Sequence, residues 1–285
     1  MKLISWNIQW CRGVDGRVDP ARIARTVKEM ADADTICFQE VARKYPALPG
    51  SKGEDQFALL AAEFPGYTPI AGIAVDVAGA AGLVGDRRQF GNLLLSRLPV
   101  RQAYRHLLPW PADPAHADMQ RVAIEAVLES EDGPLRVTTT HLAYYSLPQR
   151  LAQIEALRDL HAQAHAHAQP PQTVDAEHGP FHWLGKPSAG IVTGDFNCEP
   201  HSAEHARMLA PFDDGTPAFH DAWQVAHPGR PHATTIGLYD REQWPQPFCC
   251  DFMFVSADLA PRIRGYEINL ETQASDHQPA LLTLE

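Results

Sequence analysis

The stretch IVTGDFNCEP, residues 191–200, places Asp195 and Asn197 two positions apart, directly after an apolar run that is typical of a buried strand. Side chains at positions i and i+2 of a strand point to the same face. These two residues are therefore expected to share a face while Phe196 turns toward the core. A carboxylate and an amide side by side at a strand end can bind a hard metal ion, hold a water molecule for attack, or close an Asx turn. This stretch alone leaves the three alternatives open.

Polar residues of the same kinds recur where other predicted strands begin or end. They are Asn7, Glu40, His141, Asp251, Asp276 and His277. The ends of strands gather at the edge of a sheet, and α/β proteins build their sites there. Carboxylate and amide oxygens are suitable ligands for Mg²⁺ or Mn²⁺, and imidazoles can move protons or carry charge. Each residue taken singly has an ordinary structural explanation, but their shared position predicts a common site.

The elements that must position these residues follow from the apolar periodicity. Strands are predicted at 2–8, 34–40, 90–96, 121–129, 134–142, 189–197, 251–256, 262–269 and 279–284. Helices are predicted at 21–30, 56–64 and 148–164, and a hairpin turn at the Asp-Gly pair 132–133. Strands that alternate with helices in places and pair as hairpins elsewhere predict an α/β fold. About ten strands favour two packed mixed sheets with helices outside.

The size of the chain leaves its domain organisation open. Its 285 residues, 45% of them hydrophobic, suit one large domain or two ordinary ones. The segment at about 162–188 is rich in Ala, His, Pro and Gln and shows neither a helix nor a strand period. It predicts a long surface insertion.

The charge and the cysteines limit the possible partners and locations. The net charge is −11, from 35 acidic against 24 basic residues, which argues against a large basic surface for non-specific binding to duplex nucleic acid. A nucleic-acid substrate is still allowed, because a bound metal can neutralise phosphate locally. No apolar run long enough for a membrane span and no signal-peptide pattern is present in the sequence. Five cysteines without Cys-x-x-Cys spacing predict a reducing, cytoplasmic location and no structural zinc.

Seven short motifs follow one another in a recognisable order. They are SWNIQ (5–9), FQE (38–40), FGNLLLSRLP (90–99), THL (140–142), GDFN (194–197), DFMFVS (251–256) and SDHQP (275–279). The set resembles that of the endonuclease/exonuclease/phosphatase superfamily, which includes pancreatic-type deoxyribonucleases, AP endonucleases, neutral sphingomyelinases and inositol-polyphosphate phosphatases. The resemblance implies a four-layered sandwich of two mixed β-sheets flanked by helices. Because it runs from residue 3 to 284, it also implies a single domain over 1–285 that carries the insertion.

The resemblance implies a metal side of the site. Glu40 corresponds to the main ligand of Mg²⁺ or Mn²⁺, and Asn7 and Asp276 lie beside it. Asp195 and Asn197 correspond to the pair that orients the attacking water and helps to hold a second metal. On this interpretation they share a face because both must reach one water and one phosphate.

The resemblance also implies a phosphate side. His277 would act at the scissile phosphate as a base or as a cation, and Asp251 would orient its imidazole. His141 would hydrogen-bond a phosphate oxygen. In the deoxyribonuclease branch a carboxylate pairs with that second histidine, and the sequence does not reveal it here. Gln9 stands where AP endonucleases place an aspartate, so that activity is less expected.

Substrate contacts are expected from residues near the ends of the strands. Arg88 and its neighbour Arg87, Asn92 and Arg121 are the substrate-binding residues predicted here, although a solvated arginine is the commoner outcome.

The leading hypothesis is a Mg²⁺- or Mn²⁺-dependent phosphodiesterase, with a nuclease on DNA or RNA as one form of it. The alternative enzyme is a phosphatase or a phospholipase C-type hydrolase of a small-molecule or lipid phosphoester, sphingomyelinase-like or inositol-phosphatase-like. A non-catalytic binding module on the same scaffold is a third hypothesis, and the complete set of site residues speaks against it. We expect a phosphoester as the partner, with no transmembrane segment and no protein partner.

Overall fold

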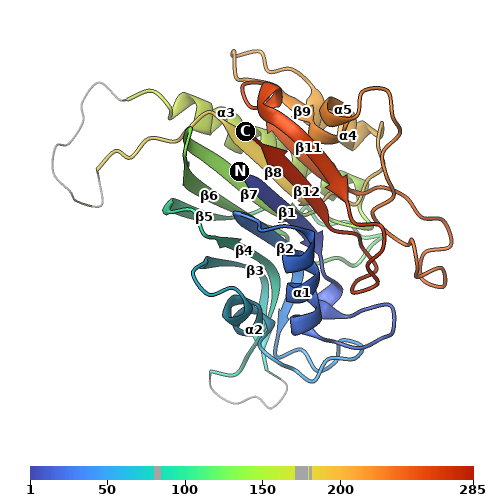
Figure 1. The fold of residues 1–285 in the computed structure, drawn as a ribbon. Coiled ribbons are helices and arrows are strands. Elements are labelled where there is room, and N and C mark those ends of the chain that lie inside the picture. Colours follow the sequence, from blue (N-terminus) through green and yellow to red (C-terminus); the bar gives the residue numbers. More distant parts are fainter. Residues whose placement is uncertain (80–84, 171–178, 180–181) are drawn as a thin grey trace.

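The computed structural model of the chain describes residues 1–79, 85–170, 179 and 182–285. Within this part, two six-stranded sheets pack face to face (Figure 1). The first has the strand order β11-β12-β1-β2-β4-β3. Its strands are β1 (Lys2–Asn7), β2 (Thr35–Arg43), β3 (Thr68–Ala78), β4 (Arg87–Ser96), β11 (Ile263–Ile268) and β12 (Ala280–Leu284). Strands β1 and β2 are parallel, whereas the other neighbours are antiparallel, so the sheet is mixed.

The second sheet repeats this plan with the order β5-β6-β7-β8-β10-β9. Its strands are β5 (Val100–Leu107), β6 (Val122–Ser130), β7 (Gly133–His141), β8 (Gly190–Asp195), β9 (Phe219–Asp221) and β10 (Asp251–Ser256). Here β7 and β8 form the parallel pair, and the other neighbours are antiparallel. Strands β8 and β10 are buried along their whole length, which explains their nearly continuous apolar sequences.

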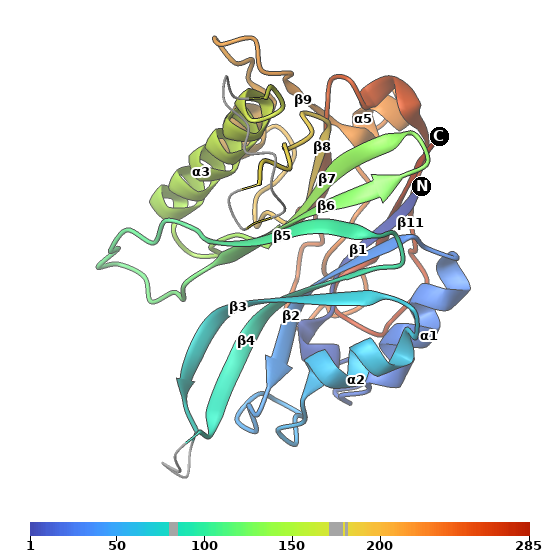
Figure 2. The same ribbon diagram turned by 90° about the vertical axis from the view of Figure 1, so that its left-hand side faces the viewer.

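Helices α1 (Pro20–Met30) and α2 (Gln56–Glu63) cover the outer face of the first sheet, and α3 (Leu147–Ala166) and α4 (Ala203–Leu209) cover that of the second (Figure 2). The short helix α5 (Ala222–Ala226) packs against β9 and β10 of the second sheet and β11 of the first. Two short 3-10 turns are η1 (Gln9–Cys11) and η2 (Ala260–Arg262). One apolar cluster joins α1 and α2 to the first sheet, another lies between the sheets, and a third joins α3 and α4 to the second sheet. The predicted four-layered sandwich of two mixed sheets flanked by helices is therefore confirmed.

Three strands escaped the sequence prediction: β3, β5 and β9. All three are edge strands, although the fourth edge strand, β11, was predicted. In β5 half-buried residues alternate with exposed ones, so it has no apolar run. Strand β3 does carry apolar residues, at 70–75, and was missed all the same. The hairpin turn was predicted one residue too late, because Ser130 pairs with Gly133 and the loop is formed by Glu131 and Asp132.

The predicted insertion at about 162–188 begins inside a helix, since α3 continues to Ala166. Its far end is tied back to the fold. Lys186 Nζ lies 3.1 Å from Glu125 Oε1, and Ser188 Oγ lies 2.7 Å from His165 Nδ1. Residues 171–178 and 180–181 lie outside the described residues, so the character of the middle of the insertion stays a prediction.

Two further observations concern the chain as a whole. No helix of the described residues is long and apolar enough to cross a membrane. All five cysteines, at positions that the structure describes, are buried and free.

Candidate functional site

The predicted residues come together where strands from both sheets end. The strand register places Asn7 beside Gln39 in the first sheet. In the second sheet it places Asp195 between His141 and Asp251. The amide of Asn7 bridges the two sheets, because its Nδ2 donates to Glu40 Oε1 at 3.1 Å and to Asp195 Oδ2 at 2.9 Å. Residues nearly 190 positions apart in sequence are thereby fixed in one place.

Glu40 does not end its strand, as the sequence predicted, but sits in a bulge within it. Strand β2 runs on to Arg43, and its register against β4 shifts between Phe38 and Val41. Glu40 has a φ of 61°, which is unusual for a residue with a side chain, and bulges of this kind re-aim a side chain. Burial first, and then the charges of Asp276 and Asp195, raise the pKa of Glu40 to about 7. The site therefore holds more negative charge than its own groups neutralise.

The GDFN motif works through a turn rather than through strand alternation. Strand β8 ends at Asp195, and Asn197 follows with a φ of 50°. The backbone N–H of Asn197 donates to Asp195 Oδ1 at 2.9 Å, which is an Asx turn. Its side-chain Nδ2 donates to the carbonyl of Leu142 at 2.9 Å. The face-sharing argument was wrong in mechanism, although both residues still lie at the same edge and Phe196 is buried as expected.

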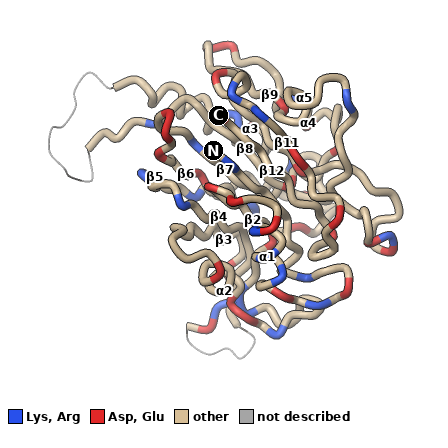
Figure 3. The backbone as a smooth tube through the Cα atoms, in the orientation of Figure 1, with Lys and Arg blue, Asp and Glu red and all other residues tan. Residues whose placement is uncertain are grey.

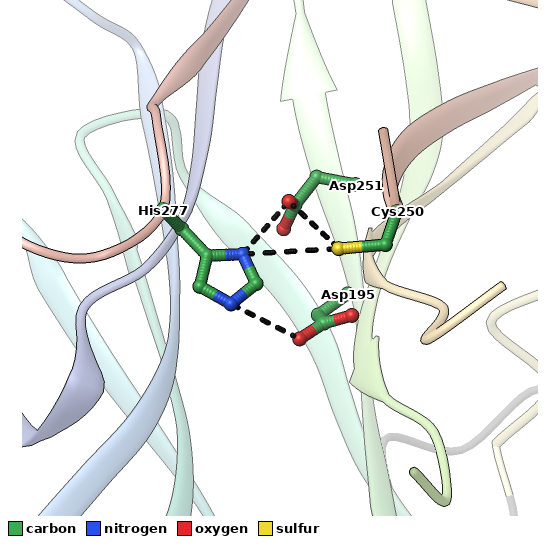
Figure 4. A group of neighbouring side chains, drawn as sticks. All are labelled: Asp195, Cys250, Asp251 and His277. Carbon is green, nitrogen blue, oxygen red and sulfur yellow. Dashed lines mark hydrogen bonds and ion pairs between the residues drawn. The ribbon is translucent and has the colours of Figure 1, made fainter. Parts of the chain in front are cut away.

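His277 stands between two carboxylates (Figure 4). Its Nδ1 lies 2.9 Å from Asp251 Oδ2, and its Nε2 lies 3.7 Å from Asp195 Oδ2. The hydroxyl of Thr235 accepts a hydrogen bond from the backbone N–H of Asp251 and fixes the start of β10. Burial would lower the pKa of His277, but the charges of Asp251, Asp195 and Asp276 outweigh it and raise the pKa well above its ordinary value. The surrounding carboxylates thus favour the charged form of this imidazole.

His141 has the opposite character. Its Nε2 lies 3.5 Å from Asp195 Oδ2, and its Nδ1 lies 3.9 Å from Glu40 Oε1. Burial, with the charges of Arg121 and His277, lowers the pKa of His141 to about 3. The site therefore offers one neutral and one charged imidazole. Asp195 and Glu40 are the carboxylates within 4 Å of His141 among those that the structure describes, but neither forms a hydrogen bond with it there.

Asp276 is held by side chains from three different segments. Its Oδ2 accepts from Gln9 Nε2 at 2.8 Å and from the indole Nε1 of Trp244 at 3.0 Å. Its Oδ1 accepts from the hydroxyl of Ser275 at 3.2 Å. Gln9 opens a turn in which three consecutive residues have positive φ values of 43°, 44° and 61°. Such left-handed backbone costs free energy in residues with side chains, so the surrounding structure must hold this turn in place.

The predicted substrate-binding residues divide into two groups. Arg121 is 5% exposed and pairs with Asp118 at 2.9 Å, and its Nε and Nη1 have no hydrogen-bond partner among the described residues. Asn92 lies beside the bulge in β2, and its Nδ2 donates to the carbonyl of Val122. Arg88 instead lies in the β3–β4 hairpin, where it donates to the carbonyl of Ala78 and covers an aromatic ring. Its neighbour on the hairpin, Arg87, pairs with Asp76.

The donor set suits a hard divalent cation. Glu40 and Asp195 offer carboxylate oxygens that Asn7 brings to a common place, and oxygen is the donor that Mg²⁺ and Mn²⁺ prefer. The raised pKa of Glu40 shows that added positive charge would be stabilising there. One group of ligand-type atoms within 4.8 Å of one another also includes the thiol of Cys250. Burial raises the pKa of that thiol well above its ordinary value, so it remains protonated and is a poor ligand for a soft metal.

Comparison with known proteins gives a consistent result. The profile of the Endonuclease/Exonuclease/phosphatase family matches residues 4–277. The chain is similar to the crystal structure of an endonuclease/exonuclease/phosphatase from Beutenbergia cavernae, with a TM-score of 0.65, 23% identity, and coverage of 99% of this chain and 70% of that one. It is similar to a mannosyl-6-phosphatase from Bacteroides thetaiotaomicron, with a TM-score of 0.66, 16% identity, and coverage of 100% and 99%. It is also similar to a 3′ phosphatase from Neisseria bound to a product DNA hairpin, with a TM-score of 0.61, 17% identity, and coverage of 100% and 99%. Among curated proteins no match was found.

Proposed function

The chain belongs to the endonuclease/exonuclease/phosphatase family, and from this premise we propose that it is a divalent-metal-dependent phosphoester hydrolase that acts on phosphodiesters. Members of the family are phosphoester hydrolases. The observation that carries the proposal is the placement of His277 between Asp251 and Asp195, next to the unneutralised carboxyl of Glu40. We further propose that residues 1–285 form a single domain, and that its free cysteines place it in a reducing cytoplasm.

Glu40 and Asp195 would hold the cation, which we propose to be Mg²⁺ or Mn²⁺. Asn7, Asn197 and Asp276 lie around them and would complete or orient this set. When bound, the ion would supply positive charge for the phosphate and for the attacking water. The chain itself supplies the fixed positions, because Asn7 and the bulge at Glu40 hold the carboxylates before any substrate arrives.

The histidines have separate tasks in this proposal. His277 keeps its proton, because Asp251 stabilises the charged ring, and its Nε2 is free to donate to a phosphoryl oxygen or to the leaving oxygen. A ring that keeps its proton favours the cationic role over the base role for His277. His141 stays neutral and can hydrogen-bond a second phosphate oxygen. Asp195, which lies near both rings, is then the group that orients the attacking water.

The balance of charge favours diesters over monoesters. Four carboxylates, of Glu40, Asp195, Asp251 and Asp276, surround one charged imidazole, that of His277. A divalent cation leaves this group close to neutral or slightly negative, so a singly charged diester is repelled less than a doubly charged monoester. This supports single-stranded nucleic acids and other diesters as the proposed substrates.

One observation favours the alternative of a phosphomonoesterase. The guanidinium of Arg121 is buried near His141, and two of its nitrogens lack a hydrogen-bond partner among the described residues. An anionic oxygen would satisfy them. Two similar structures are described as phosphatases, one of them with a DNA product. The test must therefore include both kinds of ester.

A panel of esters with and without metal tests the proposal. The purified protein is assayed with Mg²⁺, Mn²⁺ or EDTA on bis-p-nitrophenyl phosphate, p-nitrophenyl phosphate, plasmid, single-stranded oligonucleotides and sphingomyelin. We expect the diester to be hydrolysed faster than the monoester with either metal, and no turnover in EDTA. Full activity in EDTA contradicts the metal requirement. A preference for the monoester means that Arg121 sets the substrate class.

A further inference from the structure

An exposed group of aromatic side chains borders the candidate site. Tyr144 and Tyr145 follow β7 and are 39% and 61% exposed. Their rings meet edge to face at 4.6 Å, and the ring of Tyr144 meets Trp244 in the same manner at 5.8 Å. We call Tyr144, Tyr145 and Trp244 the aromatic wall. The sequence did not single out any of these three residues.

The aromatic wall is continuous with the proposed reaction centre. The indole Nε1 of Trp244 donates to Asp276 at 3.0 Å, so one end of the wall touches the acidic group itself. At the other end, Tyr144 comes two residues after Leu142, whose carbonyl accepts the side chain of Asn197. Burial first, and then the neighbouring charges of Tyr145 and Asp195, raise the pKa of Tyr144. A ring that rests on the wall would lie next to the acidic group of the site, because Trp244 contacts Asp276 directly.

The position of Trp244 is built into its loop. Its backbone N–H donates to the carbonyl of Asp240 at 3.0 Å. Its Cβ packs against Gly237, which has a φ of 73°, and a Cβ atom at position 237 would come within 2.4 Å of it. Phe248 supports the indole from behind, with ring centroids 6.1 Å apart. A tryptophan fixed in this way loses little freedom when a ligand binds, which favours binding.

The charges around the wall do not suit a long polyanion. Basic segments are short and interspersed with acidic ones along the described chain (Figure 3). Several described arginines outside the site are already paired with carboxylates, such as Arg150 with Glu204 and Arg87 with Asp76. Binding of a long nucleic acid depends on a basic groove along its backbone. The wall next to a single phosphate position instead suits a small molecule.

We propose that the aromatic wall binds a flat ring carried by the substrate, and that the substrate class is a small phosphodiester with an aryl or nucleobase group, an inference that rests on the proposed function. The faces and edges of aromatic side chains attract flat rings more strongly than puckered aliphatic rings of equal size. The wall thus selects the organic part of the substrate, while the acidic group and His277 bind the phosphate.

Two esters that differ only in the ring test this proposal. Methyl benzyl phosphate and methyl cyclohexylmethyl phosphate carry similar leaving groups, one with a flat ring and the other with a puckered ring. The ratio of their kcat/KM values is measured for the wild type and for Tyr144→Leu and Trp244→Leu. We expect a preference for the benzyl ester of about tenfold in the wild type, and a ratio near unity in both variants.

Matched variants separate ring contact from other effects. Trp244→Phe and Tyr144→Phe keep a ring and should keep the preference, although Trp244→Phe loses the hydrogen bond to Asp276. Trp110→Leu removes another exposed tryptophan outside the wall and should leave the ratio unchanged. A preference that survives Tyr144→Leu and Trp244→Leu overturns the proposal. So does faster hydrolysis of sphingomyelin vesicles than of either small ester, which would assign the wall to a lipid surface.

A binding measurement keeps this inference apart from the proposed function. Both esters are titrated into the His277→Ala protein with Mg²⁺ present, and tryptophan fluorescence is followed with Trp244→Phe as the reference. Tighter binding of the benzyl ester supports the proposal that the aromatic wall binds flat rings. It does so even if the wild type hydrolyses neither ester, because absent hydrolysis would refute the proposed function alone. Equal binding of the two esters contradicts the proposal that the aromatic wall binds flat rings, whether or not hydrolysis is observed.

Discussion

Two clusters of aspartate and histidine lie along the second sheet, and they differ in how their charges are satisfied. The first, which we call the strand-end cluster, contains Asp195, Asp251 and His277. The second, which we call the α5 cluster, contains His205, Asp221 and His232. Both are buried except for His232, which is half-buried, and both place ligand-type atoms within 4.8 Å of one another. Residue types and distances alone do not distinguish them.

In the α5 cluster a single carboxylate has all the donors that it needs. Asp221 Oδ2 lies 2.8 Å from His205 Nε2 and 2.7 Å from His232 Nε2. Its Oδ1 accepts from the backbone N–H groups of Trp223 and Gln224 at the start of α5. Burial alone would raise the pKa of Asp221, but the hydrogen bonds from the two histidines lower it to about 2. This cluster is complete as it stands and has a structural role.

The strand-end cluster has too little positive charge for its carboxylates, although Asp195 also accepts hydrogen bonds from Asn7 and Asn197. His277 is the protonated group that serves both Asp251 and Asp195, and the carboxyl of Glu40 next to them has its pKa raised to about 7. A buried charge that the protein leaves unbalanced costs stability. The difference teaches that a functional site is recognised by charge that only a ligand can balance, and not by the presence of aspartate and histidine.

The largest expected effect separates the roles of His277 and Asp251. His277→Ala and Asp251→Asn should each lower turnover of a diester about a hundredfold to ten-thousandfold, because the charged, oriented imidazole is lost. If Asp251 acts only through His277, the double variant should be little slower than His277→Ala alone. The measurement is kcat for all four proteins at saturating metal. Near-normal turnover in Asp251→Asn would mean that Asp251 only caps the start of its strand. The same would follow if the losses of turnover in the two single variants added up in the double variant.

The next effect concerns metal affinity. Glu40→Gln keeps the size of the side chain but removes the charge that the cation would balance, so it should lower apparent metal affinity at least about tenfold. Excess Mg²⁺ or Mn²⁺ should then restore part of the activity. A variant that no metal concentration improves would assign Glu40 another role in the reaction.

The α5 cluster should respond in stability and not in activity. Asp221→Asn leaves two histidines without their carboxylate and should lower the free energy of unfolding by about 2–3 kcal/mol. Denaturant unfolding gives this value, and diester turnover below the unfolding transition should equal that of the wild type. A large loss of turnover without loss of stability would place the α5 cluster in the reaction after all.

The smallest effect is the acid dependence that Asp221 contributes. Its pKa is lowered from about 3.9 in the unfolded chain to about 2 in the fold. Its contribution is therefore fully present above about pH 4 and is lost as the pH falls toward 2, at a cost of about 2 kcal/mol. The free energies of unfolding of the wild type and Asp221→Asn should therefore approach each other as the pH is lowered from about 4 to about 2. A constant gap between the two proteins would mean that the carboxylate is not the source of the stability.

The strand-end cluster was open to sequence reasoning because its residues close apolar runs and keep a recognisable order. Asp195, Asp251 and His277 are in place for that reason. The bulge at Glu40 was not predictable, since a bulge is a shift between two strands and leaves no local signal. The Asx turn at Asn197 was weighed as an alternative and is present.

The features missed by the sequence depend on contacts between distant segments. Tyr144 and Trp244 are 100 positions apart and meet only because the loops after β7 and before β10 fold over the same edge. The three residues of the α5 cluster likewise come from three separate segments, and no spacing in the sequence links His232 to Asp221. Burial and charge balance at these places become visible only in three dimensions.

A calorimetric titration with Mn²⁺ tests the contrast between the two clusters most directly. The wild type, Glu40→Gln and Asp221→Asn are titrated at the same near-neutral pH and well below their unfolding temperatures. The charge imbalance predicts that the wild type and Asp221→Asn bind Mn²⁺ with equal affinity, and that Glu40→Gln binds it at least about tenfold more weakly. Unchanged affinity in Glu40→Gln, or loss of binding in Asp221→Asn, would contradict this assignment of the metal site.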